Sequence, residues 1–299
     1  MEGLGTVSIP FYILDVFARE RFAGNQLAVF RNAGGLSDGE MQRIAKEMNF
    51  SETTFILSDE EKDGGYDVRI FTPAAELPFA GHPTLGTAYL INMEIDGGRQ
   101  KIVLNLKAGR IPVTFEEGGL TWMRQNEPVF GRTLSPEEIA PVLGLAPDEI
   151  DERYPVEEVS TGLPFIIVPL RTLESIKRAC TVPDLLFDLV RDLEAKQVLV
   201  FSPETEEEGA RLKVRVFADY LGVKEDPATG SANGCLAGYL VRHRYIGAGE
   251  IDIAVDQGRE VGRPSMLHLR AREAEGGRIQ VDVGGNVILV ARGELITRE

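Results

Sequence analysis

A short phrase, made of proline, two further residues, glycine and a polar residue, occurs twice in the chain, each time just before an apolar helical segment. Residues 76–90 read ELPFAGHPTLGTAYL, and residues 225–240 read EDPATGSANGCLAGYL. The strand-like sequences VRIF at 68–71 and VRVF at 214–217 precede the two phrases at an offset of 146 residues (214 − 68), about half of the 299-residue chain. A period of this length is too long for a solenoid, so it predicts a duplication into two related domains.

The remaining elements also favour two domains, each with a strand, a Pro/Gly turn and a central helix in the same order. A chain of 299 residues exceeds what one hydrophobic core usually organises. Capping boxes at Ser37 and Ser135 predict helix starts. We expect domains at 1–126 and 127–286, and a last strand at about 287–299 could return to the first domain. Strand-like runs lie at residues 9–17, 27–30, 51–57, 66–71, 101–106, 111–115, 120–125, 164–170, 197–201, 212–217, 250–255, 265–270, 278–283 and 286–291, and further helices are expected at about 82–92 and 183–193.

The composition argues against several classes of protein. A formal net charge of −15 disfavours nucleic-acid binding, because phosphate contacts need clustered Lys and Arg. No apolar run approaches the roughly 18 residues of a membrane helix, and the N-terminus lacks the pattern of a secretory signal. Two cysteines, Cys180 and Cys235, are too few for a disulfide framework, so we expect a cytoplasmic protein. The acidic run at 204–211 is predicted to be a solvated hairpin loop.

The two Pro/Gly turns are suited to holding an anion. A turn of this kind exposes the first backbone N–H groups of the following helix, which lack partners and lie at the positive end of the helix dipole. A carboxylate can therefore be bound locally although the whole chain is acidic. Motifs for nucleotide binding and for a serine nucleophile are absent. The first turn lacks the Lys-Ser/Thr of a phosphate loop, and the chain has neither a complete dinucleotide-binding fingerprint nor a Gly-x-Ser-x-Gly nucleophile elbow. The three histidines do not stand at the spacing of metal ligands.

Acid–base chemistry is what the remaining polar residues could support. Glu52 lies near the start of the apolar run SETTFIL (51–57) and is bracketed by Phe50 and Phe55. Burial there is expected to raise its pKa, and such a carboxyl can both give and take protons near neutrality. Taken alone, a residue such as Glu52 at the start of a strand is more often structural than catalytic, and His82 alone could equally be a helix-capping or core histidine. The other candidates in or beside the turns are Glu76, His82, Glu225, Asp226 and Ser231.

Five stretches of the chain resemble the signature blocks of the PhzF-like family of phenazine biosynthesis. They are DVFARERFAGNQLAVF, NFSETTF, RIFTPAAELPFAGHPTLGTAYL, RVFADYLGVKEDPATGSANGCLAGYL and QGREVGRPSML, and they extend from residue 15 to about residue 267. The resemblance implies an α+β, diaminopimelate epimerase-like fold: two pseudo-symmetric domains, each a mostly antiparallel β-barrel around a central helix, with the site between them. It also implies a cofactor-independent isomerase without a metal, acting on a small carboxylate-bearing substrate, and a homodimer.

The resemblance also assigns roles to individual residues. It implies a carboxyl that withdraws a proton from an acidic carbon and returns it elsewhere on the same face, while helix N-termini hold the substrate carboxylate. Relatives that racemise amino acids place a cysteine in each turn where this chain has His82 and Ser231, and Cys235 lies one helical turn farther on, which disfavours two-thiol racemisation. The implied catalytic residues are Glu52, His82 and Asp226, and the implied substrate-binding residues are Asn25, Gly81, Gly230 and Ser231.

Two other functions stay open at the level of the sequence. One is a racemase, epimerase or hydrolase acting on an amino-acid-like substrate. The other is a protein that binds a carboxylate without catalysis. The sequence alone favours the isomerase because it contains the complete set of blocks together with Glu52.

Overall fold

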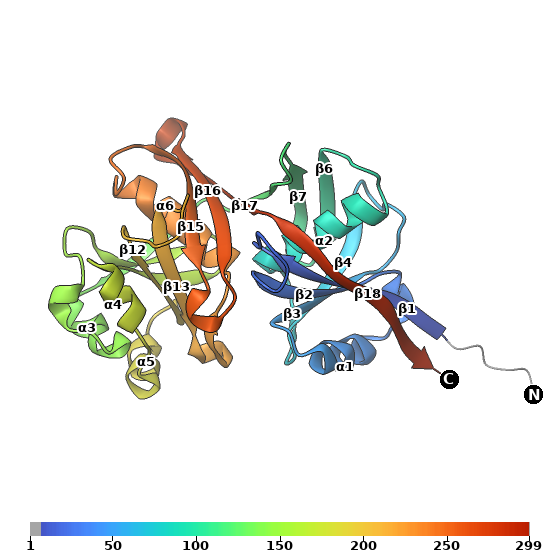
Figure 1. The fold of residues 1–299 in the computed structure, drawn as a ribbon, viewed down its shortest axis with the longest axis horizontal. Helices are drawn as coiled ribbons and strands as arrows, with labels where there is room; N and C mark the ends of the chain where they lie inside the picture. Colours follow the sequence, from blue (N-terminus) through green and yellow to red (C-terminus); the bar gives the residue numbers. More distant parts are fainter. Residues whose placement is uncertain (1–6, 299) are drawn as a thin grey trace, which may run out of the picture. The chain divides into compact units, whose positions relative to one another are not determined.

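The computed structural model describes residues 7–298, and these fall into two compact units (Figure 1). Of the described residues, 7–123 and 285–298 form the first unit, and Arg124–Gly284 form the second. Within residues 7–298, no helix is long and apolar enough to cross a membrane.

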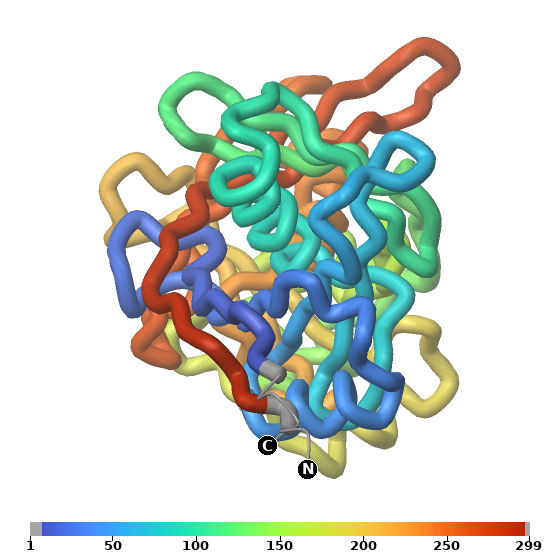
Figure 2. Tube along the Cα trace, turned by 90° about the vertical axis from the view of Figure 1, so that its right-hand side faces the viewer, coloured from blue at the N-terminus to red at the C-terminus, as the bar shows by residue number. Residues whose placement is uncertain are grey.

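The first unit is a mostly antiparallel sheet that encloses one helix. The strands pair in the order β18–β1–β2–β3–β4–β6–β7–β8, and only the β2–β3 and β4–β6 pairs are parallel. The C-terminal strand lies along β1, as Figure 2 shows where the red end of the chain runs beside the blue one. In chain order the elements are β1 (Val7–Val16), β2 (Asn25–Phe30), α1 (Asp38–Met48), β3 (Glu52–Ile56), β4 (Tyr66–Phe71), β5 (Glu76–Leu77), α2 (Gly81–Glu94), β6 (Lys101–Leu106), β7 (Gly109–Phe115), β8 (Thr121–Arg124) and β18 (Val287–Arg298).

The enclosed helix α2 is buried on almost every side. Leu85 and Ala88 are fully buried and Tyr89 is partly exposed, and ten residues of the helix are buried in all. The helix approaches the sheet closely at Gly86, where a Cβ atom would lie 2.6 Å from a methyl group of Leu27. A barrel that surrounds a helix leaves it no solvent face, so the sequence lacks the usual amphipathic stripe.

The second unit repeats this arrangement. Its strands pair in the order β9–β10–β11–β12–β13–β15–β16–β17, with β11–β12 and β13–β15 parallel, and α6 packs on β10, β11, β15 and β16. In chain order the elements are β9 (Val129–Leu134), α3 (Pro136–Ile139), β10 (Val156–Ser160), β11 (Pro164–Pro169), α4 (Leu173–Arg178), α5 (Pro183–Val190), β12 (Gln197–Ser202), β13 (Leu212–Ala218), β14 (Val223–Asp226), α6 (Gly230–Arg242), β15 (Glu250–Gln257), β16 (Ser265–Glu273) and β17 (Ile279–Gly285).

The units differ in how their outer faces are covered. In the first, α1 covers the sheet with Met41 and Ala45 packed against Phe30 and Phe55. In the second, α3, α4 and α5 share a larger apolar core with β10, β11 and β12. Both capping boxes predicted from the sequence are present: Ser37 caps α1 and Ser135 caps α3. The fold is therefore the α+β arrangement expected from the sequence, with a mostly antiparallel barrel around a central helix in each unit.

Several elements were not anticipated by the sequence. β5, β9, β10, β14 and α4 are short or rich in polar residues, so their hydrophobic pattern is weak. The acidic run at 204–211 is the loop between the antiparallel strands β12 and β13, and most of its residues are exposed, as the sequence predicted. Glu206 pairs with Lys177, and Glu207 pairs with Arg259, so this loop is tied to the body of the unit.

Candidate active site

The first unit places Glu52 and Asn25 on the side of its sheet that faces α2. Glu52 is the first residue of β3 and lies opposite Leu27 in the parallel β2–β3 register. Paired residues and residues two apart on a strand point to the same face, so Asn25, Leu27 and Glu52 share a face. Leu27 lies against the helix at Gly86. Asn25 is 2% exposed, whereas the Glu52 side chain keeps 17% of its surface exposed.

His82, in the first turn of α2, faces Glu52. Its Nε2 atom lies 3.5 Å from Oε2 of Glu52, and the His82 side chain is only 7% exposed. Burial lowers the pKa of His82 from 6.5 to about 3, although a hydrogen bond with the Gln26 backbone acts in the opposite direction. The imidazole is therefore neutral near neutral pH, and the two side chains do not form an ion pair of opposite charges.

The second unit places Asp226, Gly230 and Ser231 around the start of α6. Asp226 is the last residue of β14, and Gly230 is the first residue of α6. Thr229 Oγ1 donates a hydrogen bond to the Asp226 carboxylate. Gly230 is buried and Ser231 is partly exposed. The structure thus brings these three residues together in one unit, and it brings Asn25, Glu52, Gly81 and His82 together in the other.

Neither central helix has a side-chain cap at its N-terminus. Ala80 precedes α2 and Thr229 precedes α6, and neither side chain accepts a hydrogen bond from the first turn. The first N–H groups of a helix have no partners within the helix, so both termini can donate to an anion. In α2 this set is smaller, because Pro83 at the third position has no N–H group.

The aligned glutamates Glu76 and Glu225 are held by arginines and are not available as proton carriers. Arg69 donates hydrogen bonds to the Glu76 carboxylate through Nε and Nη2, both at 2.8 Å. Arg215 meets Glu225 in the same way, at 2.9 and 2.7 Å. The Arg69 hydrogen bonds lower the pKa of Glu76 to about 2. Each pair joins the strand that leads into a turn to its neighbouring strand, so the duplicated feature is a structural arginine–glutamate ion pair. Glu76 and Glu225 are therefore wrong as candidate acids or bases.

The thiol and metal chemistries find no support in the described part of the chain. Cys235 is fully buried, and this burial raises its pKa to about 11. A protonated, enclosed thiol is a poor nucleophile or base. Within residues 7–298, no group of three or more His, Cys, Asp or Glu side chains is placed to hold a metal ion.

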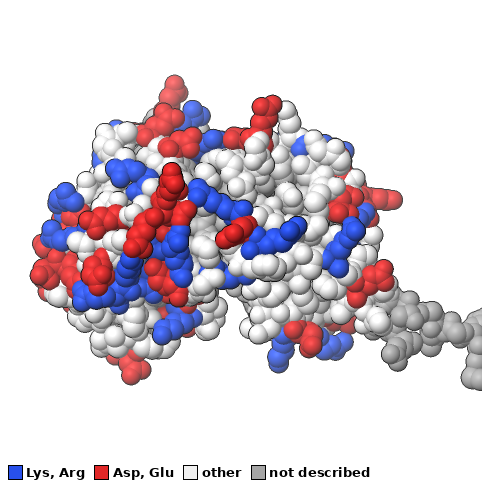
Figure 3. Space-filling view, viewed as in Figure 1, with Lys and Arg blue, Asp and Glu red and all other residues white. Residues whose placement is uncertain are grey.

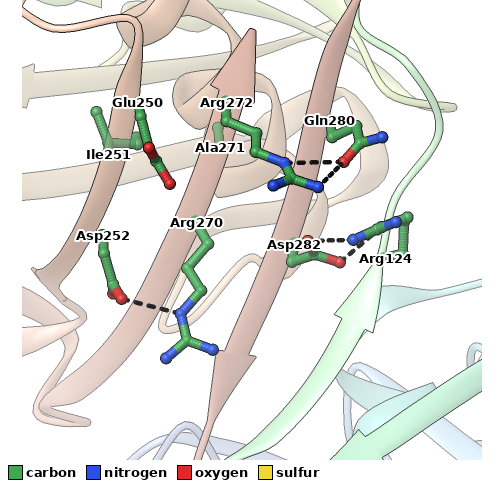
Figure 4. Close-up of a pocket in the computed structure, with 9 residues that line it drawn as sticks. All are labelled: Arg124, Glu250, Ile251, Asp252, Arg270, Ala271, Arg272, Gln280 and Asp282. Carbon is green, nitrogen blue, oxygen red and sulfur yellow. Dashed lines mark hydrogen bonds and ion pairs between the residues drawn. The ribbon is translucent and has the colours of Figure 1, made fainter. Parts of the chain in front are cut away.

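A shallow hollow on the outer face of β15, β16 and β17 does not contain any of the predicted site residues (Figure 4). Basic and acidic side chains are interspersed over β15 and β16 on the face seen in Figure 3. The three arginines that line the hollow are each bonded to a side chain on an adjacent strand, so the hollow does not present an unpaired cation. The interactions are Arg124–Asp282 at 2.9 Å, Arg270–Asp252 at 3.0 Å and Arg272–Gln280 at 3.0 Å.

Sequence reasoning missed the side chains that support the α6 turn. Gln257, Asn233 and Thr229 form a buried hydrogen-bonded network beside Asp226. The block QGREVGRPSML, which contains Gln257, was part of the family resemblance, but no chemistry in the sequence indicated what this amide does.

Two barrel units, each around a helix with an uncapped N-terminus, define the chain as an α+β protein with a diaminopimelate epimerase-like fold. A hydroxyproline epimerase from Agrobacterium vitis has this fold too, with a TM-score of 0.61 at 8% identity over 96% of this chain and 92% of its own. Residues 14–293 match the family described as phenazine biosynthesis-like protein. The chain belongs to this family.

Individual relatives agree with this assignment. The trans-2,3-dihydro-3-hydroxyanthranilate isomerase of Pseudomonas aeruginosa is 36% identical over 95% of this chain and 98% of its own length. An uncharacterised isomerase of Clostridium acetobutylicum is 32% identical over 95% and 97%. The crystal structure of a Bacillus anthracis PhzF family protein superposes with a TM-score of 0.89 at 28% identity, over 97% of this chain and 100% of that one. The protein is an isomerase.

Proposed function

We propose that the protein is a cofactor-independent isomerase in which Glu52 moves a proton between two carbons of a small, carboxylate-bearing substrate. The observation that carries the proposal is the partly exposed Glu52 carboxyl beside the buried, neutral ring of His82. The relative that acts on trans-2,3-dihydro-3-hydroxyanthranilate supports the substrate class, because that molecule carries a carboxylate and a conjugated ring. One carboxyl that takes a proton and returns it completes such a reaction without any other reagent.

The state of His82 fits a positioning role for the ring beside Glu52. Its Nε2 atom makes no hydrogen bond among the described residues, so the bond with the Gln26 backbone falls to Nδ1. A neutral ring that donates through Nδ1 has an unprotonated Nε2, which is an acceptor. Nε2 can then receive a hydrogen bond from Glu52 once that carboxyl has taken up the substrate proton. His82 would thereby orient the carboxyl between its two proton transfers.

Each unit offers candidate donors to a substrate carboxylate at the uncapped start of its central helix. Gly81 and Gly230 begin the two central helices, and the Ser231 hydroxyl adds a donor at the second. Asn25 supplies a buried amide on the same face as Glu52. Asp226 is assigned to polarising the substrate. Preorganised N–H donors of this kind hold a negative charge without reorganising during the reaction.

The test follows solvent deuterium into trans-2,3-dihydro-3-hydroxyanthranilate by NMR, comparing the wild type with Glu52→Gln. Loss of a general acid–base group should reduce turnover about 100-fold or more. Glu157→Gln is the matched control, because Glu157 forms a second Glu–His pair, with His243 at 2.7 Å, at the other end of α6. Turnover by Glu52→Gln at the level of the control would remove Glu52 from the mechanism.

Two further measurements separate the other two functions. Loss of optical rotation from amino-acid substrates that is insensitive to Glu52→Gln would favour a racemase or epimerase. Carboxylate binding without proton exchange across a panel of such acids would favour a binding protein. Cytoplasmic location and a homodimer stay predictions; size-exclusion chromatography with light scattering measures the second.

A further inference from the structure

We propose that Gln257 is a positioning residue that sets the orientation of the Asp226 carboxylate through the hydroxyl of Thr229. This inference rests on the proposed function, because it concerns the second set of residues assigned to the same reaction. It assigns a role to a side chain that has no contact with the reacting atoms in that proposal. The argument depends on the hydrogen bonds of one fully buried amide.

The amide of Gln257 uses all of its hydrogen-bonding groups on the turn before α6 and on the first turn of that helix. Gln257 is the last residue of β15, and its exposed fraction is 0%. Its Nε2 atom donates to the Asp226 carbonyl oxygen at 2.8 Å and to Thr229 Oγ1 at 3.1 Å. Its Oε1 atom accepts from Asn233 Nδ2 at 2.8 Å and from the Thr229 backbone N–H at 3.3 Å. A single side chain thus fixes both ends of the Asp226–Thr229 turn.

These contacts also decide where the Thr229 hydrogen points. A threonine hydroxyl has one hydrogen to donate and accepts through its lone pairs. Because the Gln257 amide donates to this oxygen, the hydroxyl hydrogen is left for the Asp226 carboxylate. One carboxylate oxygen of Asp226 is therefore held by Thr229, and the other keeps a defined direction. The geometry points to Gln257 as the origin of that direction.

Gln257 is itself held from both sides along the chain. The preceding residue, Asp256, lies 3.2 Å from Lys213 Nζ, and both side chains are 2% exposed. The following residue, Gly258, has φ +82°, and a Cβ atom there would lie 2.4 Å from the Pro227 carbonyl oxygen. A side chain between a buried ion pair and a backbone contact of this kind has little freedom to move, which is what a positioning group needs.

The first unit builds its turn differently, which indicates that the network serves something specific to α6. Thr84 lies three residues after Gly81, as Asn233 lies three residues after Gly230. Thr84 Oγ1 donates only to the Ala80 carbonyl oxygen, at 2.7 Å, within its own helix turn. At this position, therefore, the α2 turn is closed by a hydrogen bond within its own helix, whereas the turn that carries Asp226 is bonded by the Gln257 amide of β15.

The test uses variants that separate a change in the orientation of the Asp226 carboxylate from a loss of stability. Gln257→Glu keeps an acceptor for Asn233 and the Thr229 N–H but replaces the donor. Thr229→Val removes the hydroxyl, and Thr229→Ser keeps it. We expect Gln257→Glu and Thr229→Val to lower kcat by about 10- to 100-fold with KM within about twofold, since small misplacements of a catalytic group have effects of this size. Thr229→Ser should retain turnover within about threefold of wild type.

Crystal structures of the same variants show the orientation of the Asp226 carboxylate directly, whether or not the protein turns over a substrate. We expect the Asp226 carboxylate to be rotated in Gln257→Glu and Thr229→Val and unchanged in Thr229→Ser. An Asp226 carboxylate that keeps its wild-type orientation in the first two variants overturns the inference, as does wild-type kcat with only a lower melting temperature. If the wild type itself does not turn over trans-2,3-dihydro-3-hydroxyanthranilate, the proposed function fails for that substrate, and the crystal structures still decide the role of Gln257.

Discussion

Acidification should unfold the wild type more readily than a His82→Gln variant. Folding lowers the pKa of His82 from 6.5 to about 3, mainly through burial. The unfolded chain therefore binds a proton below about pH 6.5 that the folded chain does not bind until about pH 3. The stability associated with the neutral ring is present above the unfolded pKa and is lost as the pH falls. The amide that replaces the imidazole in the variant cannot titrate, so the variant lacks this contribution.

The size of the effect follows from the two pKa values. Each pH unit between them corresponds to about 1.4 kcal/mol, so between about pH 7.5 and pH 5 the wild type should lose about 2 kcal/mol more than the variant. Groups common to both proteins cancel in this difference. Urea unfolding at several pH values measures it, with the linear dependence on denaturant giving each free energy.

Trp122 makes the measurement specific to the unit that contains His82. It is the single tryptophan of the chain, it lies in β8 of the first unit, and it is 4% exposed. Its fluorescence therefore reports unfolding of that unit even if the two units unfold separately. Free energies of wild type and variant that stay parallel to within about 0.5 kcal/mol over this pH range would refute a neutral, buried His82.

Three further changes test other parts of the structure. Arg215→Met should destabilise the protein by about 3–5 kcal/mol in urea unfolding, because it leaves the buried Glu225 carboxylate without its cation. Iodoacetamide at neutral pH should label Cys180 in the folded protein and Cys235 only after unfolding, because the Cys235 pKa is raised to about 11; mass spectrometry of both states checks this. Gly86→Ala should lower thermal stability by about 1–3 kcal/mol, since the new methyl would lie 2.6 Å from a β2 side chain.

Local sequence patterns were sufficient for the long elements and the helix starts. The capping boxes at Ser37 and Ser135 predicted where α1 and α3 begin, because a cap depends on residues only three positions apart. The strand-like run at 164–170 predicted β11, a strand that is buried along nearly its whole length. The repeated Pro/Gly turns similarly predicted that two central helices begin at corresponding points.

Features that depend on residues far apart in the chain could not be predicted from local sequence patterns. Glu76 and Glu225 stand in the turn motifs and looked like acid–base candidates, but each is neutralised by an arginine on the neighbouring strand. The helix expected at about 82–92 is enclosed on nearly every side by strands from elsewhere in the chain. Hydrophobic periodicity cannot report an environment that is set by long-range pairing.

The sequence by itself determined the duplication, the family and the residue types available for proton transfer. Only the tertiary structure decided their chemical states: that His82 is neutral beside Glu52, that Cys235 is a protonated core thiol, and that Gln257 supports the turn of Asp226. The physical reason is that protonation and hydrogen-bond direction depend on burial and on partners brought close by folding, whereas propensity and capping depend on neighbours along the chain.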